Sequence, residues 1–126
     1  MLALYIEWHT ILSHHVKKPL RYSLGIRIDA LFAEVIEIIA LALFSPIENR
    51  ILYITRAIGK NDTLKFMLFA IYELKGIEEK QFVSLSVKAE EIGRMLYGWK
   101  NQTIKKTTPP VTGAGKQDII TRSTTR

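Results

Sequence analysis

Six apolar residues near the end of the chain recur at alternating intervals of three and four. They are Phe82, Leu85, Ala89, Ile92, Leu96 and Trp99. This spacing places one apolar side chain on the same side of a helix at every turn, so it predicts a helix over residues 78–99 that packs against other helices. Gly93 and Gly98 lie among these positions, although glycine costs a helix about 0.5–1 kcal/mol relative to alanine. We therefore expect another backbone to approach this helix closely.

Three earlier segments show the same helical periodicity, over residues 2–15, 20–43 and 46–75. With 126 residues in the chain, four such helices form one domain of ordinary size that can bury a real core. The sequence therefore predicts an all-α fold, an antiparallel up-and-down four-helix bundle spanning residues 1–103. A continuous third helix is preferred to one that breaks at residues 59–62, because apolar positions lie on two faces across that stretch.

The boundaries between these helices have recognisable signals. Pro19 predicts a break before the second helix, because the residue that precedes a proline disfavours the helical region. Ser45, Pro46 and Glu48 have the order of a capping box, which predicts Ser45 as the N-cap of the third helix. Gly76 predicts a left-handed residue just past the end of that helix.

The charge of the chain is concentrated at its C-terminal end. Residues 1–99 carry 12 Lys and Arg against 11 Asp and Glu, a net of +1, whereas residues 100–126 carry six against one, a net of +5. Residues 104–126 are also rich in Thr, Pro and Gly, so we expect a basic, flexible tail. A basic tail is typical of a protein with an acidic partner such as nucleic acid, although a merely solubilising end has the same composition.

The second helix is apolar around more of its circumference than one chain can cover. Beyond its core stripe it carries Ile26, Ala30, Ala33 and Ile36. A helix that is apolar on several sides is buried on several sides, which favours an oligomer. We predict these four residues, together with Trp99 at the end of the last helix, at a subunit interface.

Basic residues cluster at the start of the second helix and continue along the third. The cluster comprises Lys17, Lys18, Arg21 and Arg27, and Arg56 and Lys65 follow. Positive charge at a helix N-terminus opposes the helix dipole, so a sequence that keeps it there has reason to use it for binding. For the four residues at the start of the second helix, the alternative is that they extend into solvent or pair with acids on other helices.

No motif of a known catalytic or metal site is present. The chain lacks Cys, a phosphate-binding glycine loop, a zinc-protease motif and a serine-hydrolase motif. We expect no enzyme activity, no metal, no cofactor and no small-molecule substrate. The first residues do not resemble a signal peptide, and residues 35–44, the most apolar stretch, are about half a membrane span, so a soluble cytoplasmic protein without membrane contact is expected.

Three segments of the chain resemble a family of small four-helix bundles. They are KKPLRYSLGIRI, LKFMLFAIYELKG and EEIGRMLYGWK, within a similarity over residues 5–101. The family contains the accessory variability determinant (Avd) of diversity-generating retroelements and related bundles encoded in ribosomal-RNA intervening sequences. The resemblance implies a barrel-shaped homopentamer that binds RNA or DNA through basic surface and associates with the retroelement's reverse transcriptase.

The family's basic positions match particular residues of this chain. The entry to the second helix matches Lys18, Arg21 and Arg27, the Leu-basic-Phe segment matches Lys65, and the arginine of the last helix matches Arg94. Together with Lys17 and Arg56, these are the residues predicted to bind nucleic acid or reverse transcriptase. The intervening-sequence branch provides the alternative, a structural or protein-interaction oligomer that does not bind nucleic acid.

Overall fold

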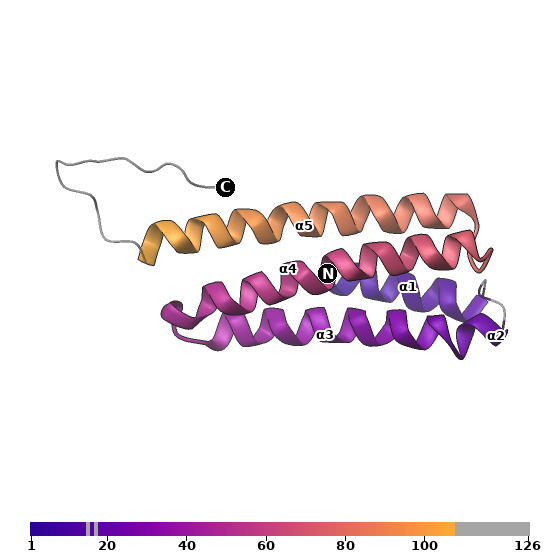
Figure 1. Ribbon diagram of the computed structural model, residues 1–126, viewed down its shortest axis with the longest axis horizontal. Coiled ribbons are helices and arrows are strands. Elements are labelled where there is room, and N and C mark those ends of the chain that lie inside the picture. Colours follow the sequence, from indigo (N-terminus) through magenta and orange to yellow (C-terminus); the bar gives the residue numbers. More distant parts are fainter. Residues whose placement is uncertain (15, 17, 108–126) are drawn as a thin grey trace.

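The computed structural model describes residues 1–14, 16 and 18–107. Within these residues the chain forms helices and no strand: α1 (Leu2–His14), α2 (Lys18–Arg21), α3 (Leu24–Phe44), α4 (Ile47–Glu73) and α5 (Glu79–Thr107). The four longer helices pack side by side, and α2 is a single turn between α1 and α3 (Figure 1). The predicted all-α class with four packed helices is confirmed, and the homopentameric ring stays a prediction.

The helices are arranged in a closed order around the bundle. The helix α1 contacts α3 and α5, and α4 contacts the same two helices from the other side. The edge formed by α1 and α3 is therefore opposite the edge formed by α4 and α5. Figure 1 shows the same arrangement, with α5 and α4 above α3 and α1.

The core divides into two clusters because α1 is shorter than its neighbours. At 1.5 Å per residue the 13 residues of α1 span about 20 Å, against about 43 Å for the 29 residues of α5. Where α1 is present, fully buried Trp8 stacks on Phe32 with ring centroids 6.1 Å apart. Beyond α1 the core is a three-helix cluster. Its buried members are Ala42, Ile54, Ala57, Ile58 and Leu96.

The predicted apolar seam of the last helix is confirmed. Leu85, Ala89 and Leu96 are buried, and Phe82, Ile92 and Trp99 are half-buried. The close approach of another backbone that we expected at the two glycines is wrong: Gly93 is buried, but a Cβ on it would make only an ordinary contact with a side chain, 3.5 Å from Asn61 Nδ2. There the fully buried Asn61 donates a hydrogen bond from Nδ2 to the Ala89 carbonyl over 3.1 Å. Gly98 is exposed, and a Cβ on it would meet no described atom within 4 Å.

The predicted second helix is wrong at its start, because the chain bends between α2 and α3. The Ser23 hydroxyl donates to the Pro19 carbonyl over 2.9 Å, and such a bond offers the backbone an alternative to continuing the helix. Gly25 then lies so close to α2 that a Cβ on it would be 3.1 Å from the Leu20 carbonyl oxygen. The bend therefore depends on contacts across the turn that a periodicity does not reveal.

The third predicted helix is continuous, as expected, but its first cap is wrong. The helix α4 runs through residues 59–62 without interruption. Ser45 is the C-cap of α3, with its hydroxyl donating to the Leu41 carbonyl, and Pro46 takes the N-cap position of α4.

The last helix continues to Thr107, four residues past the predicted end of the bundle, and residues 108–126 of the predicted tail lie outside the described part of the chain.

The turn after α4 is a Schellman motif. The sequence predicted Gly76 as its left-handed residue, but Gly76 lies one position after that residue. Lys75 is the left-handed residue, with φ of 63°. Its N–H donates to the Tyr72 carbonyl over 2.9 Å, and the N–H of Gly76 donates to the Ile71 carbonyl over 2.8 Å, which are the two bonds of the motif. Gly76 is needed for space, because a Cβ there would lie 2.6 Å from Ile71 Cγ1 and 2.9 Å from Leu20 Cδ1.

A polar side-chain pair crosses each of the four contacts between the long helices, and three of these pairs join a lysine to a glutamate. His9 Nε2 lies 2.7 Å from Asp29 between α1 and α3, and Lys60 Nζ lies 3.0 Å from Glu34 between α3 and α4. Lys65 pairs with Glu90 between α4 and α5, and Glu7 pairs with Lys88 between α1 and α5. Each pair lies at the edge of an apolar contact, so a shift by one turn would separate its charges.

No helix in the described ranges is long and apolar enough to cross a membrane.

Two glycines provide a matched test of the packing. We expect Gly76→Ala to lower the free energy of unfolding by about 1–3 kcal/mol, because the new methyl overpacks against Ile71 and Leu20. Gly59→Ala is the control: it lies in α4 with open space around it, and it should raise the free energy of unfolding by about 0.5–1 kcal/mol. Urea unfolding of both variants measures the difference. Equal effects would show that the turn after α4 has room to spare.

The Glu7–Lys88 pair predicts an acid-sensitive attachment of α1. Burial raises the pKa of Glu7, but hydrogen bonds from Lys88 and Ser84 outweigh it and hold the Glu7 pKa below its ordinary value. The stabilisation is therefore complete above the carboxyl pKa of the unfolded chain, about 4.3, and is lost as pH falls through the lower folded pKa.

We expect Glu7→Gln to lower the free energy of unfolding by about 0.5–1 kcal/mol at neutral pH and to have little effect near pH 3. Urea unfolding across this pH range measures it. Glu37→Gln, at an exposed acid of α3 with no ion pair among the described residues, is the control. A constant difference between wild type and Glu7→Gln at every pH would contradict the assignment.

Candidate nucleic-acid interface

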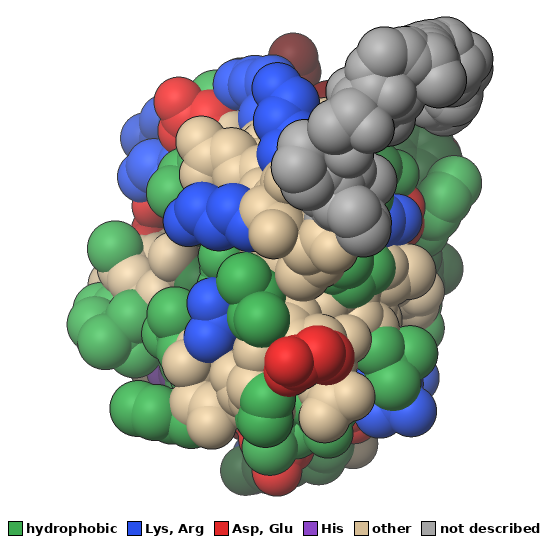
Figure 2. Space-filling view, turned by 90° about the vertical axis from the view of Figure 1, so that its left-hand side faces the viewer, with side chains coloured by type: hydrophobic (Ala, Val, Ile, Leu, Met, Phe, Trp, Pro, Cys, Tyr) green, Lys and Arg blue, Asp and Glu red, His purple; other side chains and the backbone are tan. Residues whose placement is uncertain are grey.

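The structure distributes the predicted basic residues over three places. Lys18 and Arg21 lie on α2, Arg27 and Arg56 line a groove between α3 and α4, and Lys65 and Arg94 lie near Glu90 on the α4/α5 side. The seventh residue, Lys17, lies outside the described part of the chain. Figure 2 shows basic side chains interspersed with hydrophobic and acidic ones on the end of the molecule that it presents. The predicted residues therefore do not form one continuous basic surface within a single chain.

The two basic residues of α2 differ in their surroundings. Lys18 is exposed, whereas Arg21 is half-buried and donates from Nη2 to the Val16 carbonyl over 3.1 Å. Arg21 therefore ties α2 to the turn that follows α1. Its guanidinium contributes to the local structure as well as to the charge.

Lys65 is held in an ion-pair network rather than presented to solvent. Its Nζ lies 2.7 Å from Glu90 and 3.3 Å from Asp62. The hydrogen bond to Glu90 raises the pKa of Lys65, and the same bond lowers the pKa of the Glu90 carboxyl, with the charge of Arg94 adding to the effect. Two carboxylates therefore surround the ammonium of Lys65, which the sequence had predicted as a binding residue.

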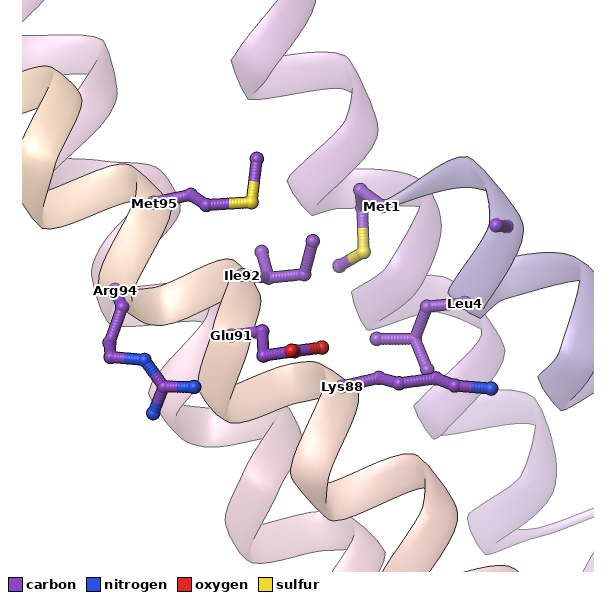
Figure 3. A pocket seen from close by; sticks show the side chains of 8 residues that line it. Met1, Leu4, Lys88, Glu91, Ile92, Arg94 and Met95 are labelled. Atoms are coloured by element: carbon purple, nitrogen blue, oxygen red, sulfur yellow. The ribbon is translucent and has the colours of Figure 1, made fainter.

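Arg94 lies beside an apolar hollow between α1 and α5. The hollow is lined chiefly by Met1, Leu4, Ile92 and Met95, with Lys88 and Glu91 at its rim. In Figure 3 the Arg94 guanidinium extends along the outer side of α5, away from Met1. Among the described residues no group of three His, Asp or Glu side chains is placed to hold a metal ion. The lining of this hollow therefore combines an apolar floor with charged side chains from α5.

The groove between α3 and α4 brings together two predicted residues and one that was missed. It is lined by Arg27, Leu31, Ile38, Arg56, Gly59, Lys60 and Thr63. The helical period explains the set, since residues 27, 31 and 38 share one side of α3 and residues 56, 59, 60 and 63 share one side of α4. A Cβ on Gly59 would meet no described atom within 4 Å, so the groove is open to solvent at this position of α4.

The groove keeps an excess of positive charge. Glu34 lies between two cations, with 3.0 Å to Lys60 Nζ and 3.9 Å to Arg27 Nη1. Arg56 lies over the Tyr53 ring at 5.8 Å and makes no ion pair with any described residue. The side chains of Arg27 and Lys60 remain 48% and 42% exposed, so both cations reach solvent despite the pairing.

Three cations and one carboxylate give the groove a net charge of about +2. Arg and Lys side chains in such an arrangement can contact phosphate oxygens, with Arg able to donate two parallel hydrogen bonds. Lys60 was absent from the predicted binding residues. Its spacing of four from Arg56 was the signal that could have identified it, because the two share one helix face.

The residues predicted at a subunit interface lie on two helices. Ile26 and Ala33 are exposed on α3, and Ala30 and Ile36 are half-buried on the same helix. Trp99 is half-buried on α5 and packs against the three-helix cluster of the core. The α3 residues therefore present apolar surface to solvent, whereas Trp99 already has intrachain contacts.

Comparison of the chain with models of protein families, with curated proteins and with solved structures finds no match. The similarity to the Avd family remains a prediction from the sequence segments quoted above.

Proposed function

We propose that this protein is a non-enzymatic accessory protein that binds nucleic acid through the groove between α3 and α4. The observation that supports this best is the convergence of Arg27, Arg56 and Lys60 on one open groove with a single acid, Glu34. The resemblance to the Avd family adds the rest of the proposal: a cytoplasmic homopentamer that associates with a reverse transcriptase and supports mutagenic copying of RNA into cDNA.

The groove suits a phosphate backbone rather than a base edge. Its cations come from two antiparallel helices and face one open channel, and its remaining lining is apolar or carries a small hydroxyl. Phosphate contacts of this kind provide affinity and position without reading the sequence. The proposed binding is therefore electrostatic, tolerant of sequence and strongly dependent on salt.

The second candidate is a structural or protein-interaction oligomer of the intervening-sequence type. The ion pairs of Lys65 with Asp62 and Glu90 favour it, because they use a predicted binding residue for contact between helices. In this case the protein assembles normally but retains no RNA or DNA at low salt.

Replacing two of the groove cations tests the proposed function. We expect the double variant Arg56→Gln, Lys60→Gln to bind a fluorescent RNA or DNA oligonucleotide at least tenfold more weakly than wild type. Each lost phosphate contact reduces the slope of log K against log salt by about 0.9, so the slope should fall by about 2. Fluorescence anisotropy over a series of salt concentrations measures both quantities.

The matched control removes the same charge elsewhere. Lys75 is exposed in the turn between α4 and α5, and Lys80 is exposed in the first turn of α5. We expect Lys75→Gln, Lys80→Gln to reduce affinity by less than threefold. Equal losses in the two double variants would mean that net charge alone drives binding. Absence of binding by wild type at low salt would exclude the nucleic-acid role and leave the second candidate.

Removing the acid of the groove should have the opposite effect. Glu34 lies between Arg27 and Lys60 and repels phosphate, so Glu34→Gln should tighten oligonucleotide binding by about three- to tenfold and make it more salt-dependent. The same anisotropy assay measures the gain. Weaker binding in this variant would show that Glu34 positions Arg27 and Lys60 and that its pairing is needed for the site.

A further inference from the structure

Large apolar side chains are exposed at several places on the bundle, and two groups of them each surround a polar pair between two helices. On the first face, which we name the α1/α3 face, Leu2 and Ile6 of α1 are 62% and 59% exposed, and Ile26 of α3 is 55% exposed. The exposed Ala33 of α3 belongs to the same face. These residues share one side because they flank the His9–Asp29 pair: Ile6 precedes His9 by three positions, and Ile26 and Ala33 lie three before and four after Asp29.

The second face, which we name the α4/α5 face, surrounds the Lys65–Glu90 pair. Phe66 and Phe69 of α4 are 76% and 49% exposed, and both line a hollow together with the ion-paired side chains of Lys65 and Glu90. On α5, the exposed Val83 and Val87 precede Glu90 by seven and three positions, which places them on the same side of that helix. The face is therefore aromatic on one helix and aliphatic on the other.

Each face is large enough to take part in a specific interface. An aromatic side chain carries roughly 200 Å² of surface, so Phe66 and Phe69 alone expose about 250 Å². With the two valines the α4/α5 face falls in the range of about 300–600 Å² that marks the largest patch on a typical monomer. A standard interface buries about 800 Å² on each partner, a little over half of it apolar, which one such face supplies.

The two faces are unlike and lie on opposite edges of the bundle. The α1/α3 edge is opposite the α4/α5 edge (Figure 1). Each face also carries exposed charges that make no ion pair among the described residues. Glu37 follows Ala33 by four positions on the α1/α3 face, and Glu73 and Arg94 follow Phe69 and Glu90 by four positions on the α4/α5 face. The rest of each face is apolar or paired within the chain, so each face is suited to a largely apolar surface such as the other.

We propose that the α1/α3 face of one copy binds the α4/α5 face of the next copy in a head-to-tail contact. This inference rests on the self-assembly within the proposed function and is independent of nucleic-acid binding. A contact between two unlike faces repeats from copy to copy, and it closes into a ring when the rotation between neighbours divides a full turn. It assigns Ile26 and Ala33 to the subunit contact, adds Leu2 and Ile6, and supplies Phe66 and Phe69 as their partners.

Two variants with one damaged face each provide the test. Ile6→Lys, Ile26→Lys damages the α1/α3 face, and Phe66→Lys, Val87→Lys damages the α4/α5 face, with the same change in charge. We expect wild type to have the mass of several 14.4 kDa subunits by light scattering or native mass spectrometry, and each variant to have the mass of one subunit. Leu52→Lys, Met95→Lys changes two exposed apolar residues outside both faces and should assemble as wild type does.

Mixing the two variants distinguishes a head-to-tail contact from a symmetric one. Each variant keeps the face that the other has lost, so an equimolar mixture should form a dimer with one copy of each and nothing larger. Dimer formation also shows that both variants are folded. If the mixture stays monomeric while each variant has the helix content of wild type, the pairing of these faces is wrong.

The remaining outcomes separate the inference from the proposed function. An assembled wild type whose face variants are equally assembled overturns the head-to-tail contact and leaves self-assembly standing. Loss of assembly in the Leu52, Met95 control alone places the interface elsewhere and also overturns the contact. A wild type that is monomeric at about 10 µM overturns both the contact and the proposed oligomer, whatever the protein does with RNA or DNA.

Discussion

Close packing of the core fixes the register of this bundle, and a polar pair at each contact between the four long helices matches it. The pairs Glu7–Lys88, His9–Asp29, Glu34–Lys60 and Lys65–Glu90 lie where neighbouring helices meet at the edge of the core. The core sets most of this register, because a slide by one turn would separate side chains that pack closely, such as Trp8 and Phe32. The polar pairs add a small preference for the same register, because partly exposed pairs contribute little to stability. The position of every surface feature along the bundle follows from this register.

The same pairs decide which edges of the bundle keep free charge. At the α1/α3 and α4/α5 edges the paired charges lie among exposed apolar side chains, and at the α3/α4 edge Arg56 adds a cation beyond the pairing. In the proposed head-to-tail assembly the apolar edges meet, and the α3/α4 edge lies between them. Every copy would then present its basic groove on the same side of the ring. Subunits with a nearly neutral body can form a strongly basic surface in this way, because the grooves of several copies lie side by side. The assembly would then strengthen the proposed nucleic-acid binding.

Sequence periodicity predicted the interiors of the helices well. The seam from Phe82 to Trp99 and the uninterrupted α4 are examples, because a 3.6-residue period places their apolar side chains on the buried side. It failed at the ends of helices. Ser23, Ser45 and Lys75 end or redirect helices through hydrogen bonds that depend on the local path of the chain, and serine and lysine are compatible with several such roles. At the candidate site the sequence identified Arg27 and Arg56. It also included Lys65 and missed Lys60, because the basic residues of one helix do not show which of them pair with an acid on a neighbouring helix.

The sequence by itself determined the all-α class, the four long amphipathic helices and the nearly neutral charge of the body, since these follow from composition and from spacing along one chain. Only the tertiary structure decided which edges the helices form, because an edge combines residues from two helices that are far apart in the sequence. Lys60 faces Glu34 and Lys65 faces Glu90 from adjacent turns of α4, yet the first lies in an open basic groove and the second within an ion-paired apolar face. The physical reason is the angle of about 100° between successive helical residues, which sends side chains five positions apart toward different neighbouring helices.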